Sequence, residues 1–197
     1  VIENYRSLKN LLKTKGYSFH TETDTEIIAD LLEMSYLQKK DILNAILETM
    51  RVLQGSYACA IICADSSNLY FMKKASPLLI GLGKGANYLA SDALPMVDYT
   101  DKFIDLDDGE YGVLTPTDIS LYIGGKSIDP VITGRDAARY DYDLGTYPHF
   151  MLKEIEESPN VIHTLADNYF DGTDYLFDKK LIKMLQGAED IVFLACG

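Results

Sequence analysis

The spacing of apolar residues changes at Gly55, and this change does most to set the fold class. Before Gly55, apolar side chains recur every three or four residues, which is the period of an amphipathic helix. After Gly55 come short runs rich in residues that favour strands, separated by turn residues. The pattern therefore predicts helices packed against a mostly antiparallel sheet, an α+β fold.

Three helices are expected before the change. The first ends at Gly16, because glycine adopts the left-handed conformation of a helix C-terminus without a Cβ clash. The second begins where Thr23 and Glu26, three residues apart, match a capping box. The third runs from about Lys40 to Leu53, with apolar residues at helical spacing.

After Gly55 the segments expected to be strands follow one another as a meander. They are Tyr57–Ala64, Leu69–Met72, Leu78–Leu82, Tyr88–Ala90, Phe103–Leu106, Tyr111–Leu114 and Ile119–Ile123. Residues 124–148 show little periodicity and are expected to form a loop or wrapping segment.

The last fifty residues are expected to be helical and to finish with a strand. A helix begins near Phe150 and is bent or interrupted by Pro159, because proline lacks the N–H that a helix interior needs. Another helix covers about Lys179 to Leu185. The continuous apolar run Ile191–Ala195 is typical of a strand buried on both faces.

Charge and composition exclude several function classes. The net charge is −12 and the isoelectric point about 4.6, so phosphate backbones and anionic lipid surfaces are disfavoured partners. No apolar run approaches the roughly 20 residues of a membrane-spanning helix, and no basic-then-apolar leader precedes the first helix. Three cysteines without framework spacing fit free thiols in a reducing compartment. These features predict a cytoplasmic protein that binds neither nucleic acid nor membrane.

Six segments, in order along the chain, carry a family resemblance. They are Val1–Tyr5, Thr21–Glu26, Ala75–Leu78, Gly81–Asp92, His149–Ile155 and Leu194–Gly197. With them the chain resembles the glutamine–fructose-6-phosphate aminotransferase family, also called glucosamine-6-phosphate synthases. Any one segment is a weak signal, but six in the family's order are specific.

The resemblance implies a type 2 glutamine amidotransferase domain, an N-terminal-nucleophile hydrolase with a four-layer αββα sandwich. In this family a cysteine attacks the glutamine side-chain amide, and ammonia passes to a sugar isomerase domain that binds fructose 6-phosphate. It also implies a homodimer and no cofactor or metal. By resemblance, residues 1–148 are the C-terminal part of the glutaminase domain, residues 149–188 connector helices, and residues 189–197 the start of the isomerase domain.

One binding residue carries over from the family pattern, and the catalytic residues do not. Asp24 matches the family aspartate that binds the α-amino group of glutamine or glutamate, in keeping with the pairing of a carboxylate with an ammonium. Asp24 also suits the first turn of a helix, where a negative charge is stabilised. The family's nucleophile, carboxylate-binding arginine and oxyanion Asn-Gly pair lie upstream of Val1. The chain by itself is therefore expected to be inactive, with no catalytic residue of its own.

The other candidate motifs favour structural interpretations. Gly81-x-Gly83-x-Gly85 lacks the ending of a phosphate-binding loop and is expected to be a hairpin turn. The acidic run Asp167–Asp178 lacks calcium-loop spacing, and Cys59 and Cys63 lack zinc-site spacing. His149, four residues before a lysine, is expected to start a helix.

Two other functions remain open on the sequence. One is a different type 2 amidotransferase, such as the enzyme that opens purine synthesis, which Leu194–Gly197 disfavours. The other is a non-catalytic binding module derived from a glutaminase. A truncated sandwich should expose unpaired strand edges, whereas a stand-alone module should not.

Overall fold

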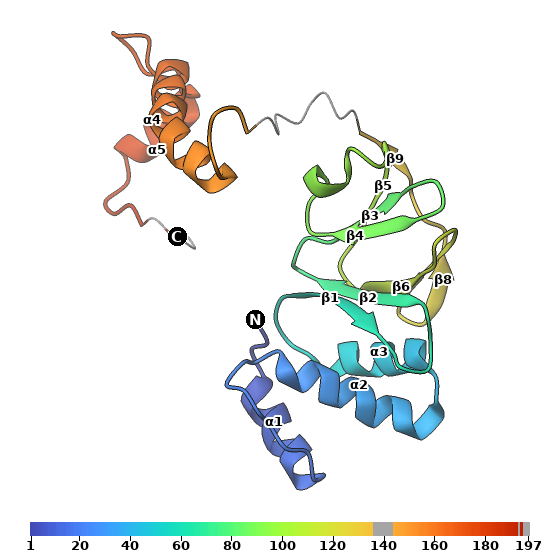
Figure 1. Cartoon of the computed structure of the whole chain (residues 1–197). Helices are drawn as coiled ribbons and strands as arrows, with labels where there is room; N and C mark the ends of the chain where they lie inside the picture. Colours follow the sequence, from blue (N-terminus) through green and yellow to red (C-terminus); the bar gives the residue numbers. More distant parts are fainter. Residues whose placement is uncertain (136–143, 193, 195–197) are drawn as a thin grey trace. The chain divides into compact units, whose positions relative to one another are not determined.

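The computed structural model describes residues 1–135, 144–192 and 194, and divides into two compact units, residues 1–141 and 142–197. The first unit carries three helices, α1 (Tyr5–Thr14), α2 (Glu26–Lys39) and α3 (Ile42–Val52), followed by the strands (Figure 1). The helices and their order agree with the sequence prediction. Among the described residues, no helix is long and apolar enough to cross a membrane.

The strands form two antiparallel sheets. The larger sheet has the order β1-β2-β6-β7-β8 and the smaller β4-β3-β5-β9. Their bounds are β1 Tyr57–Ile62, β2 Leu69–Lys74, β3 Leu79–Leu82, β4 Asn87–Ala90, β5 Lys102–Asp105, β6 Glu110–Leu114, β7 Ile119–Ile123, β8 Lys126–Ile128 and β9 Thr133–Gly134. The α+β class with antiparallel sheets is confirmed.

The predicted single meander is wrong in one respect. After the β1–β2 hairpin the chain leaves the larger sheet, forms β3 to β5 in the smaller one, and returns so that β6 pairs with β2. Residues 124–148 are also not all loop, since β8 extends the larger sheet and β9 pairs with β5. These pairings join segments far apart in sequence, which local periodicity does not encode.

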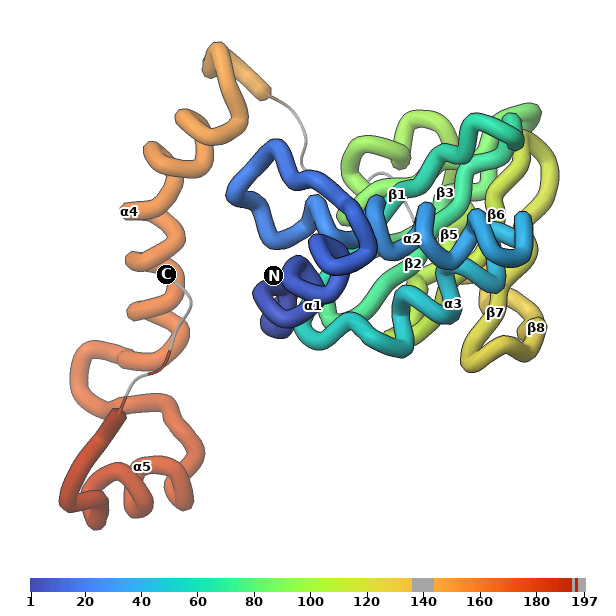
Figure 2. The backbone as a smooth tube through the Cα atoms, turned by 90° about the horizontal axis from the view of Figure 1, so that it is seen from below, coloured from blue at the N-terminus to red at the C-terminus, as the bar shows by residue number. Residues whose placement is uncertain are grey.

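Alternating side chains of β2 separate two cores. Tyr70 and Met72 pack with the helices, whereas Phe71 points to the other face and packs with Ile80 and Ile104 of the smaller sheet. The order is therefore helices, larger sheet, smaller sheet, as Figure 1 shows. Figure 2 views the same unit from its helical side, with α2 and α3 next to each other over the strands.

The outer face of the smaller sheet is covered by a short 3₁₀ segment, η1 (Leu94–Met96). Phe103 and Leu79 pack there against Met96 and Val97. These contacts cover part of the second face of the smaller sheet.

The second unit contains α4 (Phe150–Tyr169) and α5 (Lys179–Gln186). The interruption expected at Pro159 is wrong, because α4 continues through it as one helix. The strand expected at Ile191–Ala195 is wrong for the described positions 191, 192 and 194, which are exposed and not in a strand. No described segment of this unit offers a strand to pair with them, and the remaining positions of that run lie outside the described residues.

Candidate functional site

Asp24 lies in the loop between α1 and α2, two residues before α2 begins at Glu26. Its carboxylate Oδ2 accepts a hydrogen bond from the Ile2 N–H at 2.5 Å. Ile2 itself is fully buried and forms an isolated antiparallel bridge with Gly55, just before β1. The carboxylate is therefore fixed between the start of the chain, the start of α2 and the start of β1.

The second carboxylate oxygen of Asp24 accepts no hydrogen bond from the residues that the structure describes. The side chain is only partly buried, so a ligand can reach this oxygen. Its place beside the first turn of α2 stabilises the negative charge. A half-buried carboxylate with one oxygen anchored and one open is suited to bind an ammonium group.

The helix start differs from the predicted capping box. Thr25, not Thr23, is the N-cap of α2, and its side chain makes no capping hydrogen bond. The Glu26 carboxylate reaches back past Thr23 to the N–H groups of His20 and Thr21, at 2.7 and 3.0 Å. The Thr23 hydroxyl instead pairs with that of Thr21 at 2.6 Å. Side chains of the loop and of Glu26 thus accept from the N–H groups of His20, Thr21 and Thr23, and Thr23 lies outside the helix.

A groove of about 470 Å³ begins next to Asp24, since Thr25 is one of its lining residues. It runs between α2 and β1, and its walls include Ile28, Ala29, Cys59 and Ile61. A neighbouring groove of about 400 Å³ continues between the same elements as far as Lys40 and Asp65.

The groove follows a free sheet edge, because β1 is the outermost strand of the larger sheet. Ile62 is 86% exposed there.

The two cysteines in the described residues are free thiols on or next to β1. Cys59 lies in the strand, and burial raises the pKa of its thiol. A raised pKa keeps the thiol protonated at neutral pH and therefore poorly nucleophilic. Cys63 follows the strand and lines the second groove, and Cys196 lies outside the described residues.

Two motifs have the structural roles expected of them. Gly83 lies in the β3–β4 turn, where its N–H donates to the Ala86 carbonyl at 3.1 Å, as a hairpin requires. His149 is the N-cap residue of α4, as expected of a helix start.

The acidic run contains one local turn. The Asp171 carboxylate accepts hydrogen bonds from the N–H groups of Thr173 and Asp174, so it is occupied by its own loop. Among the described residues, no three histidine, cysteine or acidic side chains are grouped so as to hold a metal ion.

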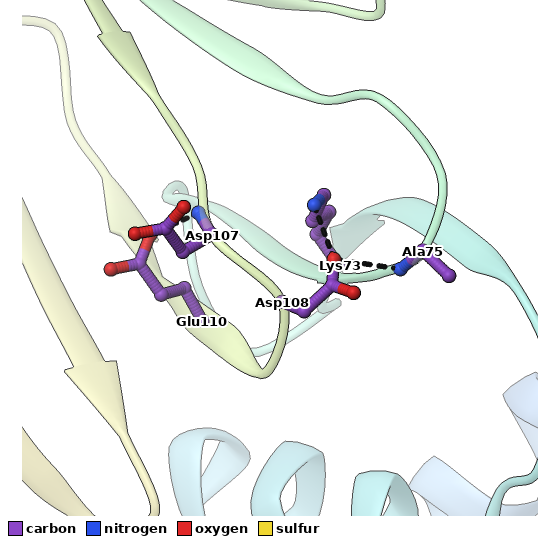
Figure 3. A network of polar contacts seen from close by, with 5 residues as sticks. All are labelled: Lys73, Ala75, Asp107, Asp108 and Glu110. Carbon is purple, nitrogen blue, oxygen red and sulfur yellow. Dashed lines mark hydrogen bonds and ion pairs between the residues drawn. The ribbon is translucent and has the colours of Figure 1, made fainter. Parts of the chain in front are cut away.

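A second polar cluster lies at the turn between β5 and β6 (Figure 3). The Asp108 carboxylate pairs with the Lys73 ammonium and accepts the Ala75 N–H at 2.8 Å. These contacts lower the pKa of Asp108, the lysine hydrogen bond being the largest cause. Glu110 is buried, its pKa is raised by burial, and it accepts the Asp107 N–H at 2.8 Å. Asp108 thus holds the backbone that follows β2, and Glu110 holds the backbone of the β5–β6 turn, so both carboxylates have structural roles.

The sequence and fold comparisons define the class. Residues 1–97 match the glutamine amidotransferase domain family. Two solved structures share the fold over 62% of this chain at 22–23% identity. They are the glutamine phosphoribosylpyrophosphate amidotransferase from B. subtilis, with a TM-score of 0.54 over 27% of that chain, and an allosteric regulatory enzyme of purine biosynthesis, with a TM-score of 0.55 over 26%. Residues 1–97 therefore match a glutamine amidotransferase domain in sequence, as predicted, and the two solved structures share its fold.

The particular relatives are the glutamine–fructose-6-phosphate aminotransferases (isomerizing), to which the chain is homologous along its whole length. It is 38% identical to the protein from Aquifex aeolicus over 199 residues and 33% identical to that from Sulfurisphaera tokodaii over 201 residues. The chain spans 32% and 33% of the length of these two proteins.

Sequence reasoning missed two residues of the site. Ile2 holds Asp24 from 22 positions away, and no local pattern signals such a contact. Glu26 was recognised only as half of a capping box, although its spacing from Thr23 did mark it as a residue that reaches back toward the loop.

Proposed function

We propose that this chain is part of the glutamine-hydrolysing domain of an enzyme that makes glucosamine 6-phosphate from fructose 6-phosphate and glutamine. The observation that carries the proposal is identity of 33–38% along the whole chain to aminotransferases of that name. Residues 1–148 would belong to the glutaminase domain, 149–188 to connector helices and 189–197 to the sugar isomerase domain. The partners would then be the isomerase domain and a second subunit, in the cytoplasm.

Within this function, Asp24 binds the α-ammonium of glutamine or glutamate. Support comes from its geometry, with one oxygen held by Ile2 and the other open. The groove that begins at Thr25 offers space beside it for the rest of a small ligand.

Replacing Asp24 by asparagine is expected to weaken binding of L-glutamine by roughly tenfold or more, because a charge-assisted hydrogen bond to the ammonium is lost. The measurement is an NMR titration of the 197-residue chain with L-glutamine. N-acetyl-L-glutamine, which lacks the ammonium, is the chemical control and should bind the wild-type chain no better than L-glutamine binds D24N. Equal binding of L-glutamine by both chains would remove Asp24 from the site.

The 197 residues alone are expected to release no ammonia from glutamine above background. Glutamine hydrolysis needs an activated nucleophile, and the pKa of the Cys59 thiol is raised rather than lowered. A coupled assay of ammonia release from the purified chain checks this, with C59S and C63S variants as controls. Robust ammonia release by the wild-type chain would contradict the prediction. Loss of that release in C59S or C63S would then show which thiol is responsible.

A further inference from the structure

The loop that carries Asp24 is held from its far end by one carboxylate. Glu26 accepts three hydrogen bonds from the two residues that open the loop. Its Oε1 receives the His20 N–H at 2.7 Å, and its Oε2 receives the Thr21 N–H at 3.0 Å and the Thr21 hydroxyl at 2.7 Å. Residues 20 and 21 are thereby tied to the first residue of α2.

Other contacts complete the same frame. The Lys9 ammonium, on α1, donates to the Thr21 carbonyl at 3.3 Å and lies over the Phe19 ring. The Thr21 and Thr23 hydroxyls are 2.6 Å apart. The segment between positions 20 and 26 is therefore closed into a short loop whose two ends meet at Glu26.

Asp24 is part of this closed loop, and among the described residues its carboxylate accepts a hydrogen bond from the Ile2 N–H alone. A ligand-binding carboxylate must be held within about 0.5 Å of a productive position. Since Asp24 is only two residues from Glu26, releasing residues 20 and 21 would free the backbone that sets the direction of its side chain.

Glu26 acts here as an anion. The hydrogen bond from the His20 N–H is the largest of the contacts that lower the pKa of Glu26, followed by that from the Thr21 hydroxyl. Both carboxylate oxygens face donors. A glutamine at this position would turn its NH₂ group toward the donors of either His20 or Thr21. The E26Q exchange should therefore break the hydrogen bonds to one of these two residues.

We propose that Glu26 is a positioning residue for Asp24: by closing the 20–26 loop, it holds the Asp24 carboxylate at the Ile2 N–H with one oxygen free for a ligand ammonium. The ligand part of this statement rests on the proposed function. The positional part does not, because the Ile2–Asp24 hydrogen bond is present in the chain without ligand.

The test compares E26Q and E26D with the wild-type chain and with E22Q. Glu22 is the matched control, because it lies in the same loop, is exposed, and makes no side-chain hydrogen bond among the described residues. The readouts are ¹⁵N amide shifts and hydrogen exchange without ligand. The His20 and Thr21 amides report on their hydrogen bonds to Glu26, and the Ile2 amide reports on its hydrogen bond to Asp24.

In E26Q the His20 and Thr21 amides are expected to exchange roughly tenfold faster or more, as loss of a hydrogen bond to a charged group allows. The Ile2 amide signal should move toward its position in D24N. E26D, which keeps the charge but not the reach, should give an intermediate change, and E22Q none. If E26Q does not fold, E26D still tests the role of Glu26.

Two results would overturn the inference. One is faster exchange at His20 and Thr21 with an unmoved Ile2 signal, which would make Glu26 a local loop residue only. The other is E26Q behaving like E22Q at all three amides.

Glutamine titration then separates this inference from the proposed function. If wild type binds, D24N does not and E26Q binds as well as wild type, the positioning role fails while the proposed function stands. If wild type does not bind, or D24N binds as wild type does, the assigned ligand fails, and the Ile2 signal still decides the role of Glu26.

Discussion

Phe71→Ala is expected to lower the free energy of unfolding of the first unit by about 3 to 5 kcal/mol. Phe71 is fully buried between the two sheets, with Ile80 and Ile104 of the smaller sheet around it. Its cross-strand neighbour is Gly112, and a Cβ there would lie 2.7 Å from the end of the Phe71 ring. The ring therefore fills the space that the missing glycine side chain leaves, and alanine would leave a cavity.

Urea unfolding measures this effect, read as a lower midpoint with an unchanged slope. Ile62→Ala is the control, since Ile62 is a large apolar residue of the adjacent strand but is 86% exposed. It should change stability by no more than about 0.5 kcal/mol. Phe71→Leu, which leaves a smaller cavity, serves if the alanine variant does not fold. Equal losses for F71A and I62A would mean that the two sheets do not share a packed core.

Periodicity predicted the elements well because it is a local property. The stripe of α1, for example, places Leu8 and Leu12 in the core. The partition into two sheets was not predictable in this way, because the pairing of β2 with β6 is decided by contacts some forty residues apart.

The candidate site was likewise predicted only in part. Asp24 was predicted as a ligand-binding residue from a sequence resemblance, and that role stays a prediction. The structure shows that its carboxylate lies beside the start of α2. The contacts of Glu26 with His20 and Thr21 were not predicted. A capping box and a carboxylate that closes the preceding loop can share the same three-residue spacing from Thr23 to Glu26. They differ only in which N–H groups come within reach, which depends on the path of residues 20 to 23.

Gly55→Ala is expected to destabilise the chain for two independent reasons. Gly55 has φ +112°, a conformation that costs a residue with a Cβ about 1 to 3 kcal/mol. A Cβ at this position would also lie 2.3 Å from the Val1 carbonyl oxygen and 3.1 Å from the Glu3 nitrogen. Those are backbone atoms, so the contact is relieved only if residues 1–3 or the start of β1 move.

Gly16→Ala separates the two causes. Gly16 has φ +93°, but nothing lies within 4 Å of a Cβ built there, so this variant carries the backbone strain without the clash. Gly55→Ala should cost about 1 to 3 kcal/mol more than Gly16→Ala, the usual range for overpacking. Urea unfolding of the two variants gives the difference. Equal losses would mean that the approach of residues 1–3 to Gly55 contributes nothing.

The same variant links stability to the site. Ile2 bridges Gly55 and donates to Asp24, so moving residues 1–3 away from position 55 should break the hydrogen bond to Asp24. The Ile2 amide signal should therefore shift in G55A as in D24N and stay in place in G16A. If G55A loses stability while the Ile2 signal stays in place, the strain is absorbed in β1, and Asp24 is held independently of the Gly55 bridge.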